Sequence, residues 1–373
     1  MRSVAGSVVS NGSDWASILL VAIILTSFLL NFTDIPQKMQ LWRWASFIRK
    51  RLYILERLEG DSRERAARYL SKLKIKEPER IIDNFANNYF IINPVNIEPT
   101  DIIKRLKHLL RTRDKAVKDY VNAVLRDVDD SIKRNTEVVL EVVSVISLIN
   151  KVVKHYFQLG LKFNNWILVM QLALEMPLIL RIMQAYHDSL EAFTKGLPIG
   201  DGAGPLVARK LLGANGSPEE VVEDTEVYKT EYKGRNVYVI KAKGPGATVG
   251  WPGDAVEKVI ERLKGKVSRI ITVDAALKLE SEKTGEVSYG VGAAIGDPGP
   301  EKIAIERVAT KYSIPLEAIV IKMSDVEAIN VMSKEVYEGV KKAVGLVKKI
   351  IEDKVPIGSN VIVVGIGNTV GIK

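Results

Sequence analysis

Residues 270–277 read IITVDAAL, an apolar run that carries Asp274 near its carboxyl end. Three more short apolar runs have the same character: Val237–Ile240, Ala318–Ile321 and Val361–Val364. Amphipathic stretches of helical length alternate with them: Pro205–Leu212, Asp254–Leu263, Pro300–Tyr312 and Ser333–Glu352. Such alternation is typical of helices that cover a parallel sheet. We therefore predict that residues 194–373 form an α/β three-layer sandwich with a mainly parallel sheet.

Ligands of open α/β sheets bind beyond the carboxyl ends of the strands, and four segments of this sequence fall at such positions. Besides ITVDAAL, they are GLPIGDGAGPLVARKLL (196–212) with Asp201 and Gly204, AKGPGATVGWPGD (242–254) with Gly246, Gly250 and Asp254, and GVGAAIGDPGPEK (290–302) with Asp297. Taken singly, Asp201, Asp254 and Asp297 can each simply cap a helix. Asp274 is different, because a carboxylate between apolar runs needs a ligand or a hydrogen-bond network.

Several classes of site are disfavoured. The chain has no cysteine, which excludes disulfides, thiolate metal sites and a cysteine nucleophile. Its three histidines, His108, His155 and His187, are scattered without metal-ligand spacing and are predicted to be ordinary helix residues. The glycine loop at 244–253 lacks the Gly-Lys-Ser/Thr ending of a phosphate-binding P-loop.

Residues 33–193 are predicted to be mostly helical. Asp61 precedes SRERAARYLSKL and is predicted to cap a helix. A long helix is predicted to start at Thr100 and Asp101. From Val139 to Tyr156, apolar residues recur every three or four positions, which indicates a helix face that packs on another helix or on a second subunit. The helical region is thus a candidate for homo-oligomer formation.

Residues 15–32 read WASILLVAIILTSFLLNF, contain no charge and are long enough to cross a thin bilayer. A short extracytoplasmic tail, residues 1–14, precedes this predicted transmembrane helix. Five basic residues follow it before position 52, against one before it, so the positive-inside rule places the C-terminal side in the cytoplasm. A cleaved signal peptide is the alternative, but no small-residue cleavage site follows the run.

Residues 166–183, WILVMQLALEMPLILRIM, are also strongly apolar. Glu175 and Arg181 lie within them, and a second span would bury both charges at a cost of several kcal/mol. We predict a buried core helix or a helix that lies in the membrane interface.

The net charge of +9 is unevenly distributed along the chain. Residues 33–193 hold 27 Lys and Arg against 20 Asp and Glu, whereas residues 194–373 hold 26 against 24. An anionic lipid bilayer is the partner that this excess near the membrane predicts. Nucleic acid is disfavoured, because acids interrupt the basic residues and no recognised nucleic-acid module is present.

Several segments of the C-terminal half resemble a known family in order and spacing. GDGAGPLVARKLL (200–212) is similar to the Asp-x-x-Gly-Pro segment of the germination proteases, and GATVGWPGDAVEKVIERL, ITVDAAL, IGDPGP and SIPLEAIVI resemble the later motifs of that family. The hydrogenase-maturation endopeptidases share the general fold. The resemblance covers about 180 residues and implies a phosphorylase/hydrolase-like fold. The whole chain also resembles an uncharacterised family of archaeal membrane proteins.

The resemblance implies functional roles for Asp201 and Asp274. Two carboxylates facing one cleft can share a proton and activate water, or can hold a divalent metal ion. Asp297 and Asp325 are weaker candidates for the same cleft, and Gly204, Gly246 and Gly250 are predicted to support it. The peptidases can offer a histidine in the third loop, whereas this chain has Asp297 there.

One strand stands in an unusual place. In these peptidases, a strand ending Gly-x-Gly-Asn comes directly before the Asp-x-x-Gly-Pro loop. Here the matching sequence is NVIVVGIGN, residues 360–368, near the other end of the chain. This order indicates a circular permutation. Two functions therefore remain open: a membrane-anchored hydrolase, possibly an endopeptidase acting on a protein or peptide, and a non-catalytic ligand-binding or scaffold protein.

Overall fold

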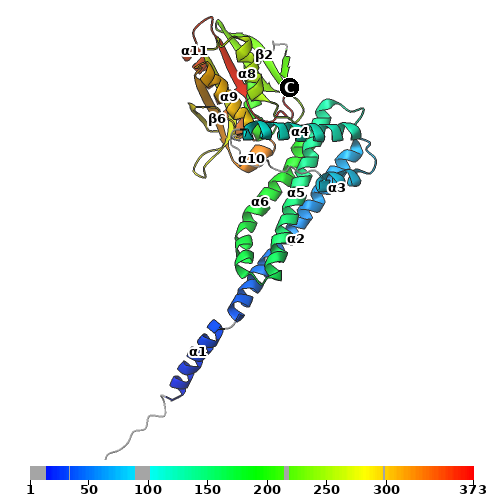
Figure 1. The fold of residues 1–373 in the computed structure, drawn as a ribbon, viewed down its shortest axis with the longest axis vertical. Coiled ribbons are helices and arrows are strands. Elements are labelled where there is room, and N and C mark those ends of the chain that lie inside the picture. Colours follow the sequence, from blue (N-terminus) through cyan, green and yellow to red (C-terminus); the bar gives the residue numbers. More distant parts are fainter. Residues whose placement is uncertain (1–13, 33, 89–100, 214–217, 297–298) are drawn as a thin grey trace, which may run out of the picture. The chain divides into compact units, whose positions relative to one another are not determined.

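The computed structural model describes residues 14–32, 34–88, 101–213, 218–296 and 299–373 (Figure 1). The chain divides into two compact units. The first, unit 1, consists of Met1–Arg57 and Ile149–Leu180, and the second, unit 2, consists of Leu58–Leu148 and Arg181–Lys373.

The N-terminal half is helical, as predicted. Its helices are α1 (Asp14–Phe32), α2 (Ile35–Lys72), α3 (Pro78–Asn88), α4 (Ile102–Val124), α5 (Asp130–Lys162) and α6 (Trp166–Lys195). The prediction that a helix begins at Asp61 was wrong, because α2 runs through this position. The Asp61 carboxylate accepts a hydrogen bond from the Arg65 side chain at 2.9 Å and contacts the buried His187 ring, so it does not cap a helix.

One helix of the described residues is long and apolar enough to cross a membrane, and it is α6. Only 22% of its most apolar stretch is buried: Val169, Ala173 and Met176 are buried, whereas Leu174 is 64% exposed. Of the two alternatives predicted for this segment, a buried core helix and a helix in the membrane interface, this exposure disfavours the first. The predicted span at 15–32 forms α1, whose apolar stretch Ser17–Phe28 is shorter.

A seven-stranded sheet forms the centre of the C-terminal half. Its strands are β1 (Glu219–Val222), β2 (Thr225–Tyr232), β3 (Arg235–Ala242), β4 (Arg269–Leu277), β5 (Val287–Val291), β6 (Leu316–Met323) and β7 (Asn360–Gly365). The spatial order is β1-β2-β3-β7-β4-β6-β5. All four predicted apolar strands are present, and β7 lies in the middle between β3 and β4.

The sheet is mixed, so the structure does not confirm the prediction of a mainly parallel sheet. Strands β3, β7, β4 and β6 are parallel to one another, whereas β1, β2 and β5 pair antiparallel with their neighbours. The antiparallel strands were missed because they are not continuous apolar runs. Strand β2 is mostly polar, and the two-residue loop Lys233–Gly234, with positive φ at both residues, turns it directly into β3.

Helices pack on both faces of the central strands: α7 (Ala203–Leu212), α8 (Pro252–Arg262), α9 (Pro300–Lys311) and α11 (Lys334–Lys354). Successive residues of β7 contribute to two separate cores. Val361 and Val363 join a cluster with residues of α7 and α11, and Ile362 and Val364 join one with residues of α8 and α9. Burial on both faces explains why β7 reads as an unbroken apolar run.

Candidate functional site

The carboxyl end of β7 lies directly against the loop that carries Asp201. A Cβ atom on Gly367, which has φ of +130°, would lie 1.9 Å from the Asp201 carbonyl oxygen, so only glycine fits there. The next residue, Asn368, donates its backbone N–H to Asp201 Oδ2 at 2.8 Å. The two ends of the C-terminal half therefore meet at this aspartate.

Asp201 lies in a short 3₁₀ turn, η1 (Gly200–Gly202), that leads into α7. Its side chain is half-buried. The predicted supporting residue Gly204 explains the close approach of this turn to the sheet. A Cβ there would lie 2.2 Å from the carbonyl oxygen of Ile366 and 2.4 Å from that of Val273. Gly204 thus lets the start of α7 pack against the ends of β7 and β4.

Asp274 lies within β4, three residues before the strand ends. Its side chain is buried, with 5% exposed. Asp274 Oδ1 accepts the N–H of Ala275 at 2.7 Å, and Oδ2 accepts the N–H of Gly296 at 3.0 Å. Thr272 accepts the N–H of Ala294 at 2.8 Å and so holds the same loop along β4.

The structure brings these two aspartates together electrostatically. Burial raises the pKa of Asp201, opposed by the N–H of Asn368. Burial, and to a smaller extent the charge of Asp201, raise the pKa of Asp274 well above its usual value. The hydrogen bonds from the N–H groups of Ala275 and Gly296 lower this pKa but do not outweigh the other two effects. A carboxyl group whose pKa is raised by burial and by a neighbouring negative charge keeps its proton to a higher pH than a free carboxyl group does.

The other predicted acids are placed differently. Asp325 is 47% exposed at the start of α10 (Asp325–Ile329), and its carboxylate pairs with Arg181 at 2.6 Å rather than with Asp201 or Asp274. Asp297 lies outside the described residues. Among the residues that the structure describes, no group of three or more His, Asp or Glu side chains could hold a metal ion.

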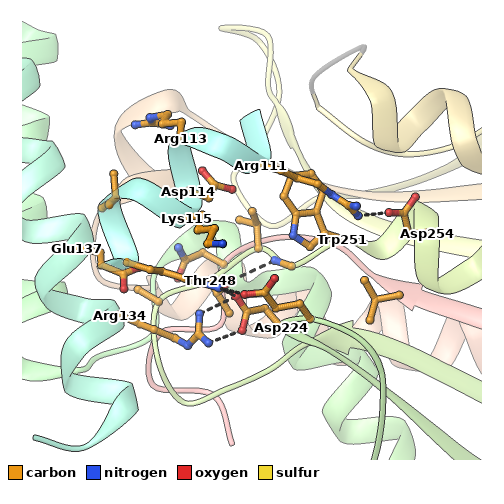
Figure 2. Close-up of a pocket in the computed structure, with 18 of the residues that line it drawn as sticks. Arg111, Arg113, Asp114, Lys115, Arg134, Glu137, Asp224, Thr248, Trp251 and Asp254 are labelled. Carbon is orange, nitrogen blue, oxygen red and sulfur yellow. Dashed lines mark hydrogen bonds and ion pairs between the residues drawn. The ribbon is translucent and has the colours of Figure 1, made fainter. Parts of the chain in front are cut away.

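A cavity of about 820 Å³ lies in unit 2 (Figure 2), and neither Asp201 nor Asp274 lines it. Its wall is formed by α4, α5, the turn between β1 and β2, and the loop 247–251. Asn368, whose backbone binds Asp201, also lines it. The predicted supporting residues Gly246 and Gly250 shape the loop. A Cβ on Gly246 would lie 2.9 Å from the Arg134 side chain, and one on Gly250 would lie 2.5 Å from Thr225 Oγ1.

Ion pairs between the helices and the C-terminal half line the cavity. Asp224, in the turn between β1 and β2, is buried and accepts a hydrogen bond from Arg134 Nη1 at 2.8 Å, a shorter one from Arg134 Nη2, and one from Lys118. Figure 2 shows Arg134 and Asp224 facing each other across this wall. Burial alone would raise the pKa of Asp224, but these cations outweigh it and lower the pKa. On the other side, Asp254 pairs with Lys107 and Arg111.

Among the acids that line the cavity, Glu137 has the most strongly raised pKa. Burial raises its pKa to about 7, against the opposing charges of Arg134 and Lys118. Burial also raises the pKa values of Asp114 and Glu141. A carboxyl group with a pKa near neutral can both donate and accept a proton under ordinary conditions, which is the property of a general acid or base.

Comparison with known families covers nearly the whole chain. Residues 22–196 match the N-terminal domain of a family described as a protein of unknown function (DUF1512), and residues 199–373 match the C-terminal domain of the same family. The chain belongs to the DUF1512 family. A comparison with curated proteins finds no match.

Both DUF1512 domains contribute to the cavity. The N-terminal domain supplies α4 and α5, and the C-terminal domain supplies the turn between β1 and β2, the loop 247–251 and Asn368. Sequence reasoning missed these helix residues. The signal that could have found them is the spacing of Lys107, Arg111 and Lys118, which are four and seven residues apart and so share one face of α4.

From the sequence alone, Asp254 was a candidate helix cap. In this DUF1512 protein it lies in the first turn of α8, and its side chain binds the cations of α4. The N–H groups of Gly253 and Asp254 are instead bound by Glu301 Oε2, at 2.7 and 3.3 Å. Asp254 therefore joins the helical region to the C-terminal domain.

Proposed function

We propose that this DUF1512 protein is a membrane-anchored hydrolase in which Asp201 and Asp274 form a proton-sharing carboxyl pair. The observation that carries the proposal is that the charge of Asp201 helps to raise the pKa of the buried Asp274. A peptide bond is the substrate that the resemblance to germination proteases favours, so we propose an endopeptidase.

The chemistry requires one ionised and one protonated carboxyl group. Asp201, the more exposed of the two, takes a proton from a water molecule as the water oxygen forms a bond to the carbonyl carbon. It then passes this proton to the leaving amine as the C–N bond breaks. Asp274, kept protonated by burial, donates a hydrogen bond to the carbonyl oxygen of the scissile bond. The adjacent cavity accommodates the substrate on the side of Asn368.

The position of β7 supports a permuted peptidase-like fold. This strand lies between β3 and β4 and leads through Gly367 and Asn368 to Asp201. In the germination proteases, the equivalent strand leads directly into the loop with the aspartate. We propose that the DUF1512 C-terminal domain is a three-layer sandwich with this strand order, in which β7 occupies the place of that first strand.

We further propose that α1 anchors the protein in the cell membrane, with the N-terminus outside and the C-terminal domain in the cytoplasm. The exposed apolar side chains of α1, such as Ile18 and Phe28, and the basic residues that follow support this orientation.

The test is peptide hydrolysis by the full chain in detergent micelles, measured with fluorescent casein and a fluorogenic peptide library. We expect Asp201→Asn and Asp274→Asn each to reduce turnover by about 100-fold or more. Asp325→Asn is the matched control, because this carboxylate is exposed and pairs with Arg181, and it should retain activity. Melting temperatures of all variants show whether each is folded. Activity that survives in folded Asp201→Asn and Asp274→Asn proteins would refute the proposal.

A divalent cation bound by the same two carboxylates is tested separately. Among the described residues, no group of three or more His, Asp or Glu side chains could hold a metal ion, so no step is assigned to a metal. Activity is measured after EDTA treatment and after addition of Mg²⁺, Mn²⁺ or Zn²⁺. Loss and recovery of activity would assign the pair to metal binding instead of direct proton transfer.

The second candidate function is ligand binding without catalysis. The observation that favours it is the large charged cavity, whose walls come from both DUF1512 domains. Under this proposal, a small molecule bound between α4, α5 and the loop 247–251 would stabilise the junction of the domains. A rise in melting temperature on ligand addition, unchanged in Asp201→Asn, combined with no hydrolysis by the wild type, would favour binding over catalysis.

A further inference from the structure

The hairpin of helices α5 and α6 has an apolar outer face that its own packing leaves uncovered. The inner faces meet closely: Val153 and Phe157 of α5 and Val169, Ala173 and Met176 of α6 are all buried. A Cβ on Gly160 would lie 2.5 Å from the Val169 side chain, so the two helices are in tight contact near the turn. The outer apolar face is therefore additional to a complete helix–helix interface.

On each helix of the hairpin, exposed apolar side chains recur on one side. On α6, Ile167, Leu174 and Leu178 are 49%, 64% and 48% exposed, and their spacing of seven and four residues places them on one side of the helix. On α5, Val152 and Tyr156 are four residues apart and 43% and 46% exposed. An apolar stripe of this length is normally covered in a folded protein.

The tip of the hairpin has the composition of a membrane-interface segment. Phe163 is 66% exposed, and the Lys162 ammonium lies 5.7 Å from its ring centroid. An aromatic ring beside a lysine suits the boundary between acyl chains and headgroups, because the long lysine stem lets its charge reach water.

Charge identifies the partner that this face fits. Unit 1, which contains this part of the hairpin, has ten Lys and Arg against four Asp and Glu, a net charge of +6 out of +9 for the chain. Its α2 segment also exposes Met39 and Trp42, at 66% and 69%. Exposed apolar side chains together with excess positive charge match an anionic lipid surface, which offers both hydrocarbon and negative headgroups.

We infer that the outer face of the α5–α6 hairpin, formed by Val152, Tyr156, Phe163, Ile167, Leu174 and Leu178, lies in the interface of an anionic lipid bilayer. The hairpin is then a second membrane contact, separate from the anchor proposed for α1. Glu175, exposed beside this face, favours a position in the interface over a complete crossing, because a span would bury its charge.

The absence of cysteine allows a clean test by site-directed spin labelling. Single variants Phe163→Cys, Leu174→Cys and Leu178→Cys of the full chain are labelled with a nitroxide and reconstituted in vesicles of phosphatidylcholine and phosphatidylglycerol. Accessibility to oxygen, which concentrates in lipid, is compared with accessibility to a water-soluble nickel chelate. Ile357→Cys is the matched control, because Ile357 is an apolar residue of unit 2 that is 77% exposed.

We expect the three hairpin labels to favour oxygen over the nickel chelate, and the label at 357 to show the reverse. Hairpin labels that match position 357 would overturn the inference, since the face would then lie in water. Dipolar broadening at 174 and 178 that disappears on dilution with unlabelled protein would also overturn it, because a second copy would then cover the face. A label in Ile24→Cys tests the α1 anchor independently: a water-like signal there refutes the anchor alone.

Discussion

The pairing of Arg134 with Asp224 should be one of the strongest links between the helices and the C-terminal domain. Asp224 is 5% exposed and receives two hydrogen bonds from the Arg134 guanidinium. A hydrogen bond to a charged group contributes about 1.5–3 kcal/mol, which gives roughly 3–6 kcal/mol for two. Lys118 remains with Asp224 when Arg134 is removed and offsets part of the loss. We therefore expect a coupling free energy of about 3 kcal/mol.

The assay is a double-mutant cycle of Arg134→Ala and Asp224→Ala, with the free energy of unfolding measured by urea denaturation. The cycle removes the effect of lost packing between the Arg134 side chain and Gly246. The matched control is the cycle of Arg181 and Asp325, whose side chains are 49% and 47% exposed. An exposed pair contributes less than about 1 kcal/mol. A coupling for Arg134 and Asp224 no larger than that of the control would refute the reasoning.

The coupling free energy between Arg134 and Asp224 should depend on pH. The folded pKa of Asp224 is lowered, so its contribution to stability is present above the unfolded value, near 3.9, and is lost as the pH falls through the folded value. We expect the coupling free energy to be constant from pH 7 to pH 5 and to shrink below about pH 4. An unchanged coupling at the lowest pH at which the protein stays folded would contradict this explanation.

Two further predictions concern the cavity and the aspartate loop. The pKa of Glu137 is raised to about 7 in the folded protein, so its contribution to stability is present below the pKa of the unfolded state and is lost as the pH rises through 7. Relative to wild type, Glu137→Gln should therefore be about 1–2 kcal/mol more stable at pH 8 than at pH 5. An equal difference in the free energy of unfolding at both pH values would show that Glu137 does not titrate in this range. Gly367→Ala should cost about 2 kcal/mol or more and displace Asp201, because its Cβ would lie 1.9 Å from the Asp201 carbonyl oxygen. The control Gly345→Ala, in an exposed part of α11 with no atom within 4 Å of the added Cβ, should be neutral or slightly stabilising, and equal destabilisation of both variants would contradict the steric argument.

The central strands, whose side chains are buried on both faces of the sheet, were predictable from the sequence. Strands β3, β4, β6 and β7 read as unbroken apolar runs, because side chains on either side enter a core. Strands β1, β2 and β5 lack that signal. Strand β2 is mostly polar, and its pairing depends on the turn at Lys233–Gly234. The lysine there has a positive φ, which its residue type does not indicate in the sequence.

The candidate site divides in a similar way. Asp201 and Asp274 were predicted because each lies in a local pattern, a glycine loop or a buried strand, that the resemblance also marks. Glu137 and Asp224 were missed, since their surroundings are formed by segments about 90 residues apart in the chain. No local pattern predicts a raised or lowered pKa that arises from such distant partners. The cavity is therefore a property of the assembled domains.

The place of β7 has a consequence for how the C-terminal domain forms. Without this strand, the sheet would separate into two halves, β1-β2-β3 and β4-β6-β5, each with an unpaired inner edge. These edges remain open during synthesis until residues 360–365 are made, and exposed edges invite pairing with other chains. The same insertion delivers Gly367 and Asn368 to Asp201, so the carboxyl pair is completed in the step that joins the half-sheets. A nascent chain would thus carry no assembled carboxyl pair before β7 is in place.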